Sequence, residues 1–430
     1  MLKKKCLFAN PIIIFLLLII PKYTSAQNHV SYKAQYICSL MSMAAYDDEF
    51  SSLAKKTLSV YGWHFESFDK PGNNLSQKFF LAYNNNFKKN ENSYILAIRG
   101  TSDYNDITSD IKISLIPFPQ NKKSTSAVLN KQQKDAVIPM VHSGFNKYVD
   151  EAFFTEKFQG KTLGQSLVHL LKKDHNAHLY ITGHSLGGAA AILTAVKLTN
   201  LGISPTQISV ITFGSPAIGN EAFAKIYGSK INLLRIVMSG DSVRNLAQIF
   251  NSHYKLFGRE IKYFPVESYD NKLHHRILLY VDMALRRYYQ NKQKPPLNDL
   301  LSTAKVIYTA PSFHISTEQY KENIDKYICL ALADTTHHYI KGSCWTSGKT
   351  PLILPLSCKY IVNTDIVIAR QKYVKNSYYT SISYTIYNTH TNRLITVISA
   401  ATNTVSLTPV EAVLYNSIKL QPDLQKILVF

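Results

Sequence analysis

Cysteine is scarce in this sequence, with 5 residues in 430, and no two of them show the Cys-x-x-Cys spacing. That lack argues against a zinc module, which holds its metal through closely spaced thiolates.

Acidic residues are also few, 28 against 48 lysines and arginines, which gives a formal net charge of +20. A positive surplus of this size favours anionic surfaces as partners. The basic residues are scattered and no nucleic-acid-binding motif is present, so no nucleic-acid partner is expected and acidic lipid is the partner that the charge favours. An ordinary solvated surface with no specific electrostatic role is the alternative.

Long apolar runs are lacking as well. The ten apolar residues Pro11–Ile20 follow three lysines near the N-terminus, and they are fewer than the about 20 residues that span a bilayer. Small residues at Thr24–Ala26 then offer a cleavage site. This pattern predicts a secretory signal over residues 1–26 and an exported protein, secreted or periplasmic. An uncleaved N-terminal anchor is the alternative.

Four cysteines remain after the predicted signal. An even number in an exported chain permits one or two disulfides. Cys344 and Cys358 are close in sequence and form the favoured pair, whereas the other two are Cys38 and Cys329. Buried, reduced thiols are the alternative.

Strands and helices alternate from about residue 77 to residue 293. Short β-branched or apolar runs predict strands at 77–83, 94–98, 177–182, 208–213 and 233–238. The alternation predicts an α/β fold with a mostly parallel sheet flanked by helices. Ligand sites in such sheets lie beyond the carboxyl ends of the strands. The polar residues just past the expected strand ends are Thr101, Ser185, Ser215 and Asp241.

The last third of the chain has a different pattern. Residues 361–368 and 378–399 alternate Thr, Ser, Ile, Val and Tyr, and a turn is expected at 388–392. We therefore divide the mature chain into an α/β domain, residues 27–296, and a β-rich accessory region, residues 297–430.

The stretch Gly183–Gly188 (GHSLGG) lies between an expected strand and an expected helix. A serine in this context, with glycine two residues to either side, is the nucleophile-elbow pattern. The tight turn raises Ser185 above the sheet, and the helix that follows directs free amides toward developing negative charge.

A serine hydroxyl needs a base to take its proton, and the base needs an acid to orient it. Asp241 follows an apolar strand and is favoured over Asp270 and Asp282 as the acid. His274 and His275 begin the next helix and are the leading candidates for the base. His142 and His184 flank the site and are expected to position backbone. Weaker candidates for the base are His253, His314, His337 and His338.

The ordered set of motifs resembles the class 3 lipases, the family that includes filamentous-fungal triacylglycerol lipases. The resemblance covers about residues 30 to 290 and implies an α/β-hydrolase fold with no metal and no cofactor. It implies Ser185 as nucleophile, Asp241 as acid and His275 as base. The matching pieces are Ile98–Thr101, Val141–Phe145, Gly183–Gly188, Thr212–Pro216 with Gly219–Asn220, Asp241–Val243, and His275 with Tyr280.

The resemblance also places an oxyanion hole at the amides of Thr101 and Leu186. Three positions depart from the family pattern, namely Ala217, Arg244 and Leu256. They leave the triad intact and bear on substrate specificity.

A long segment, residues 102–140, follows the expected oxyanion residue. It contains an apolar cluster at Leu115, Ile116 and Phe118, together with several lysines. A soluble protein favours burial of such a cluster. We expect a lid that covers the acyl groove in water and opens at a lipid surface; a static surface loop is the alternative.

The sequence thus predicts a secreted serine hydrolase that cleaves carboxylic esters of lipids, a triacylglycerol lipase or esterase, through an acyl-enzyme. A phospholipase A or lysophospholipase is the alternative within enzymes, and the positive charge favours it. An alternative of another class is a binding or adhesion protein on a hydrolase scaffold. Peripheral contact with an anionic membrane surface is expected.

Overall fold

The structure is a computed structural model. It describes residues 30–46, 48–66, 79–100, 115–118, 138–155, 157–158, 160–243, 253–266, 271–292, 302–316, 324–346 and 354–429. The predicted signal segment lies outside these ranges. Among the helices described, none is long and apolar enough to cross a bilayer.

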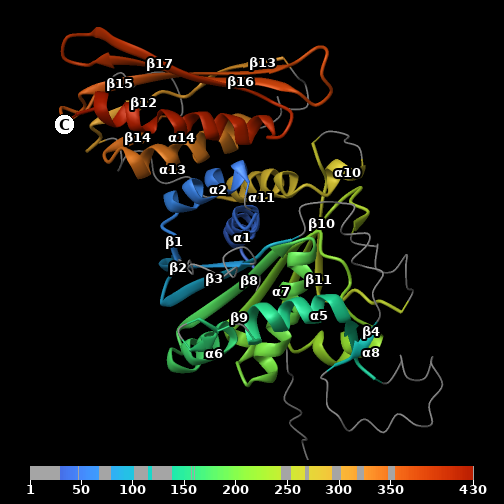
Figure 1. Cartoon of the computed structure of the whole chain (residues 1–430). Coiled ribbons are helices and arrows are strands. Elements are labelled where there is room, and N and C mark those ends of the chain that lie inside the picture. The colour runs from blue at the N-terminus through green and yellow to red at the C-terminus, as the bar shows by residue number, and fades with distance from the viewer. Residues whose placement is uncertain are drawn as a thin grey trace, which may run out of the picture.

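A seven-stranded sheet forms the centre of the first domain (Figure 1). Its strand order is β1-β2-β3-β8-β9-β10-β11. The five strands from β3 onward run parallel, and β1 and β2 pair antiparallel at one edge. The predicted α/β fold is confirmed by this topology. The strands are β1 (His64–Glu66), β2 (Phe79–Lys88), β3 (Glu91–Ile98), β8 (Ala177–His184), β9 (Ile208–Phe213), β10 (Asn232–Met238) and β11 (Arg259–Tyr263).

Helices cover both faces of this sheet, which explains why its central strands are apolar throughout. In β9, Ile211 and Phe213 belong to the core on one face, whereas Val210 belongs to the core on the other. The first face carries α1 (Tyr32–Ala44), α2 (Glu49–Val60) and α11 (Ile277–Asn291). The second face carries α5 (Ser143–Val149), α6 (Leu163–Lys173), α7 (Leu186–Asn200) and α8 (Glu221–Tyr227) (Figure 1).

Short elements connect these layers. They are β4 (Leu115–Pro117), which pairs with β5 (Met140–His142); the π-helix Asp150–Thr155; the pair β6 (Lys157–Phe158) and β7 (Lys161–Thr162); the 3₁₀ turn Pro205–Gln207; and α10 (Asn271–His274).

The C-terminal region contains a second sheet, in the order β14-β12-β15-β16-β17, with β13 also paired to β15. Its three long strands form an antiparallel meander. The expectation of β structure holds, but two helices that the sequence did not predict cover the inner face (Figure 1). The elements are β12 (Val306–Tyr308), β13 (Ser312–Ile315), α13 (Ile324–Tyr339), β14 (Ser343–Trp345), β15 (Tyr360–Arg370), β16 (Tyr378–Asn388), β17 (Arg393–Thr404) and α14 (Pro409–Ile427).

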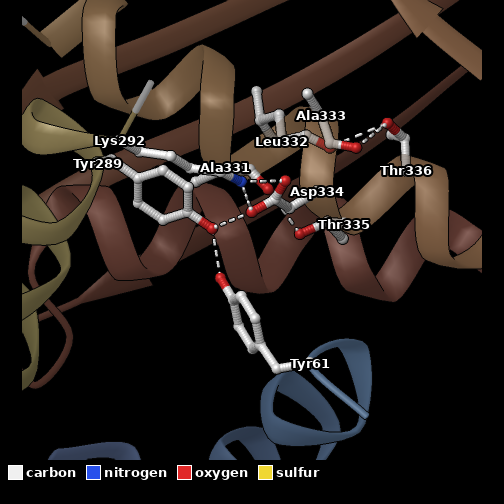
Figure 2. Close-up of polar contacts among 9 residues, drawn as sticks. All are labelled: Tyr61, Tyr289, Lys292, Ala331, Leu332, Ala333, Asp334, Thr335 and Thr336. Atoms are coloured by element: carbon white, nitrogen blue, oxygen red, sulfur yellow. Dashed lines mark hydrogen bonds and ion pairs between the residues drawn. The ribbon is translucent and has the colours of Figure 1, made fainter. Parts of the chain in front are cut away.

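The two regions share one hydrophobic core, which runs from α1 and α11 into α13, α14 and the second sheet. A polar cluster crosses the same junction (Figure 2). Tyr61, which follows α2, hydrogen-bonds the hydroxyl of Tyr289 on α11, which donates to Asp334 Oδ2 of α13 at 3.0 Å. Lys292 Nζ lies 2.6 and 2.5 Å from the two oxygens of Asp334. The C-terminal region is therefore packed onto the α/β domain by both apolar and charged contacts.

The four cysteines that follow the predicted signal segment form no disulfide among the residues described, so the predicted disulfides are absent from the structure. Cys344 and Cys358 do lie together, in a small apolar cluster with Ala304 and Ile307. The Cys358 thiol donates to the carbonyl of Tyr360 at 3.4 Å. Burial raises the pKa of both thiols, which keeps them protonated.

A buried carboxyl at the start of α14 makes stability pH-dependent. Glu411 completes the capping box with Thr408 and is 6% exposed. Burial, followed by the nearby charge of Asp282, raises its pKa to about 8. Because this pKa lies above its value in the unfolded chain, the stabilisation is complete below about pH 4.5 and is lost as the pH rises toward 8.

We therefore expect Glu411→Gln to raise the free energy of unfolding at pH 8.5 by roughly 1 to 4 kcal/mol and to change it little at pH 5. Urea denaturation at both pH values measures this. Asp423→Asn, an exposed site on the same helix, is the control and should show no such difference. Equal effects of Glu411→Gln at both pH values would contradict the prediction.

Candidate active site

Ser185 stands between the end of β8 and the start of α7. Its backbone has φ 57° and ψ −127°, and its N–H donates to the carbonyl of Phe213 at 2.9 Å. A non-glycine residue at positive φ is strained and is held only by its surroundings. A Cβ at Gly183 would lie 2.3 Å from the carbonyl carbon of Gly187, and one at Gly187 would lie 2.2 Å from the oxygen of Ile98. Both glycines are therefore required for the predicted elbow, which the structure contains.

Asp241 and His275 meet beside this elbow. Asp241 follows β10, and His275 occupies the turn between α10 and α11. His275 Nδ1 lies 2.9 Å from Asp241 Oδ2, and both residues are buried. The carboxylate can only accept, so Nδ1 carries the proton and Nε2 is free to act as a base. Gly214, at φ 57°, leaves room for the pair, because a Cβ there would lie 2.8 Å from Asp241 Oδ2.

The carboxylate of Asp241 is held by two further donors. Tyr280 Oη donates to Oδ2 at 2.5 Å, and the N–H of Val243 donates to Oδ1 at 2.9 Å. Tyr280 in turn accepts from the N–H of Met238 at 3.0 Å. Such donors fix the orientation of the carboxylate and stabilise its negative charge. The spacing from His275 to Tyr280 was the sequence feature that marked this tyrosine.

Ser185 Oγ and His275 Nε2 are both buried, and neither has a hydrogen-bond partner within the described part of the chain. A buried polar atom without a partner costs free energy. Catalytic hydrogen bonds in ligand-free enzymes are often long and tighten only when substrate is bound. These two atoms are therefore available for a reacting group, the serine as nucleophile and the imidazole as base.

The competing acids and histidines are placed elsewhere. His274 packs on Gly240, and a Cβ added at Gly240 would lie 1.8 Å from the Nδ1 atom of His274. Asp282 on α11 forms a buried ion pair with Arg286 at 2.9 Å, and Asp270 and Arg244 lie outside the described residues. His314 belongs to β13, and His337 and His338 end α13. His142 accepts from the N–H of Phe145 at 3.2 Å and caps α5, as expected of a backbone-positioning residue.

The predicted oxyanion hole is described only in part. Leu186 is the first residue of α7, whose N-terminus has no side-chain cap. Amides of an uncapped first turn are suited to an anion. Thr101 lies outside the described residues. The oxyanion hole therefore stays a prediction.

The expected lid is also described only in part, since residues 101–114 and 119–137 lie outside the described ranges. Leu115 and Ile116 are half-buried in β4, which pairs with β5. Phe118 is buried against the rings of Phe223 and Tyr227, with centroids 5.4 and 5.6 Å away.

Lys197 Nζ lies 5.2 Å from the centroid of the Phe118 ring. Lys197 is 12 residues beyond Ser185, about 18 Å along α7. Phe118 is thus a packing residue at the far end of α7, and its substitution would act on stability.

Sequence reasoning missed Tyr46, whose hydroxyl lies behind the elbow and contacts His184. The signal that could have found it is indirect. A Cβ at Gly100 would lie 2.5 Å from Tyr46 Oη, so the glycine of the Arg99–Gly100 pair indicates that another side chain approaches the backbone closely here.

Within the described residues, no group of three His, Cys, Asp or Glu side chains could hold a metal ion.

The C-terminal region reaches the turn that carries His275. A cavity of about 30 Å³ lies between them, lined by Leu273 and Arg276 on one side and by Asn376, Tyr378 and Leu407 on the other. This volume holds about one water molecule. The second sheet therefore packs directly against the residues that flank His275.

Comparison with known proteins finds a family that part of the chain resembles. The family model for Lipase (class 3) matches residues 95–250. A lipase of Caenorhabditis elegans is 44% identical over 73 residues, which are 16% of this chain and 21% of the worm protein. Phospholipase A1-II 1 of Oryza sativa subsp. indica is 30% identical over 160 residues, 35% of this chain and 38% of the rice protein. The chain thus spans less than half the length of these curated relatives.

A solved lipase from Rhizopus microsporus var. chinensis is 20% identical, with a TM-score of 0.40, over 56% of this chain and 76% of that one. The matched range includes Ser185 and Asp241. Residues 95–250 of this chain are thus similar to the class 3 lipase family.

Proposed function

We propose that the protein is a serine hydrolase that cleaves carboxylic esters of lipids through an acyl-enzyme. The observation that carries the proposal is the juxtaposition of the strained Ser185 with the hydrogen-bonded pair of Asp241 and His275. A nucleophile, a base and an acid in this order along the chain are what ester hydrolysis needs.

The proposed reaction has two halves. His275 Nε2 takes the Ser185 proton as Oγ attacks the ester carbonyl, and the amides of Leu186 and Thr101 hold the resulting oxyanion. The intermediate collapses, the C–O bond breaks, and the alcohol leaves with the proton from His275. Water then gives a proton to His275 and attacks the acyl-enzyme, and the carboxylic acid leaves as Ser185 recovers its proton. Asp241 stabilises the imidazolium in both halves.

The substrate class rests on the relatives. Those compared above are a lipase and a phospholipase A1. A neutral glyceride is the first candidate. A phospholipid is the second, favoured by the rice relative and by the net charge of +20, because a positive surface attracts anionic headgroups.

A panel of emulsified triacylglycerols and phospholipid vesicles tests the proposal, with product fatty acid measured by titration and the positional isomer by mass spectrometry. Labelling of Ser185 by a fluorophosphonate is the parallel readout. Hydrolysis of neither class, with no labelling of Ser185, would favour the binding-protein alternative. Export through residues 1–26 is part of the proposal, and N-terminal sequencing of the mature protein tests it.

We also propose peripheral contact with an anionic lipid surface. The β15–β16 turn exposes Tyr373 by 90% and Val374 by 46%, and Lys372 Nζ lies 5.5 Å from the Tyr373 ring. Phe264, which follows β11, is 62% exposed beneath Lys262. An aromatic ring flanked by lysine suits the headgroup layer, where the ring is buried and the cation meets phosphate.

We expect the double change Tyr373→Ser, Val374→Ser to weaken vesicle binding at least roughly fivefold, because it removes the apolar area that enters the interface. The measurement is co-sedimentation of the Ser185→Ala protein with phosphatidylcholine vesicles, with and without phosphatidylglycerol. Leu394→Ser with Val397→Ser, an exposed apolar pair on β17, is the control. Equal loss for both pairs, or binding indifferent to phosphatidylglycerol, would contradict the prediction.

A further inference from the structure

His184, the residue before the nucleophile, is buried and uses both ring nitrogens. Nδ1 lies 2.6 Å from Tyr46 Oη, and Nε2 lies 2.6 Å from the backbone oxygen of His275. The three residues come from a turn after α1, from the last position of β8 and from the turn before α11. They lie far apart in the sequence, separated by 138 and 91 residues, so only the fold brings them together.

The chemistry of the partners fixes the proton positions. A carbonyl oxygen can only accept, so His184 Nε2 carries the hydrogen and donates to His275. Neutral Nδ1 then has a lone pair and accepts from the Tyr46 hydroxyl. Burial, followed by the neighbouring His275, lowers the pKa of His184 well below its usual range. A proton on Nδ1 would leave the Tyr46 hydroxyl hydrogen without an acceptor, so the hydrogen bond also favours the neutral ring.

The carbonyl that His184 binds lies where the backbone has few hydrogen bonds of its own. His275 lies between two helices, and Arg276, which precedes α11, provides no side-chain cap. The bond from His184 therefore anchors the backbone of the base where helical hydrogen bonds are lacking. The His184 ring also packs against the His275 ring, with centroids 4.5 Å apart. A charge on His184 at this distance would oppose formation of the imidazolium on His275.

Space for this arrangement is provided by Gly100. A Cβ there would lie 2.5 Å from Tyr46 Oη and 2.4 Å from the carbonyl oxygen of His184. The glycine thus permits the tyrosine to approach the end of β8.

We propose that Tyr46 and His184 are positioning residues that hold the base His275 through its backbone carbonyl and keep the neighbouring ring uncharged. This inference rests on the proposed function of His275 as the base. It gives His184 a role beyond the turn in which the nucleophile lies, and it assigns a functional role to the N-terminal helix layer.

The test is Tyr46→Phe, which removes one hydroxyl and keeps the ring. We expect kcat on a soluble ester to fall roughly tenfold at pH 8, with KM changed less than about twofold. The deficit should grow toward pH 5.5, because His184 without its donor takes a proton more readily and then opposes the imidazolium. A purely structural role would give a loss independent of pH.

Tyr263→Phe is the matched control. Its hydroxyl is also buried and donates to Gln35 of α1 at 3.0 Å. We expect it to lower Tm about as much as Tyr46→Phe and to leave kcat unchanged at every pH. Wild-type kcat in Tyr46→Phe from pH 5.5 to 8, or parallel losses in both variants, would overturn the proposal.

A second readout does not need hydrolysis. In the Ser185→Ala protein, ring ¹⁵N shifts of His184 should show the single Nε2–H tautomer from pH 5.5 to 8.5, and in Tyr46→Phe protonation of the ring should begin toward pH 5.5. A wild-type protein that neither hydrolyses esters nor reacts with a fluorophosphonate would refute the proposed function and leave this readout standing. A His184 ring whose protonation is the same with and without the Tyr46 hydroxyl would refute the proposed positioning role of Tyr46.

Discussion

Replacement of Ser185 by alanine should lower kcat on a small chromogenic ester at least about a thousandfold. The nucleophile is removed, and its loss disables the whole triad, because the members act as a unit. The residual rate would come from water attack in a site that still binds substrate and stabilises the oxyanion. Initial rates over a range of substrate concentrations measure the effect on kcat and KM separately.

The fold should be retained in this variant. Ser185 Oγ makes no hydrogen bond within the described structure, so alanine leaves no partner unsatisfied. Alanine at φ 57° keeps the strain that serine already bears. We therefore expect a Tm within a few degrees of wild type, which circular dichroism would check.

Ser215→Ala is the matched control. Ser215 is also buried just past the end of a strand, and its hydroxyl donates to the carbonyl of Pro216 at 3.1 Å. This variant should lose a little stability and keep most of its turnover. Near-full activity in a folded Ser185→Ala protein would contradict the proposal of a serine hydrolase and favour a binding role for the scaffold.

The parts of the fold that the sequence predicted are those encoded locally. β9 is apolar at every position because both faces of the parallel sheet are covered, and that pattern is visible in the residues alone. The elbow is also local, since its glycines and serine lie within five residues. By contrast, the contact of Tyr46 with His184 joins positions 138 residues apart, and no short pattern encodes such a contact.

The missed helices have a different cause. α13 contains isoleucines and threonines as well as two adjacent histidines, and α14 contains Pro422. These residues are poor helix formers, so the sequence of each segment does not indicate a helix. Tertiary packing decides the outcome, because both helices place apolar residues such as Ile328 and Val413 in the shared core.

Phe118 shows the limit of composition as a guide. The cluster predicts burial in water, which the structure shows for Phe118, but it does not predict which side chains bury the ring. The lid itself stays a prediction. The structure gives Phe118 two aromatic partners on α8. Burial against a helix more than 100 residues away in the sequence could not be inferred from the cluster itself.

Two adjacent histidines offer the sharpest test of the proposed base. We expect His275→Ala to lower kcat by roughly 10³-fold or more, because the Ser185 proton then has no acceptor. Asp241→Asn should lower it by about 10⁴-fold, since an amide that donates to Nδ1 favours the wrong imidazole tautomer. Both rates are measured on the same soluble ester, with Tm as the check on folding.

His274→Ala is the control, because it alters the adjacent residue, whose ring packs on Gly240. His274 is half-buried against Gly240, whereas His275 Nδ1 bonds to Asp241 Oδ2. The His274 variant should therefore keep most of its turnover, within about threefold of wild type. If His274→Ala were inactive and His275→Ala active, the base would be assigned to the wrong member of the pair. Equal losses in both would mean that the turn, rather than one imidazole, determines the rate.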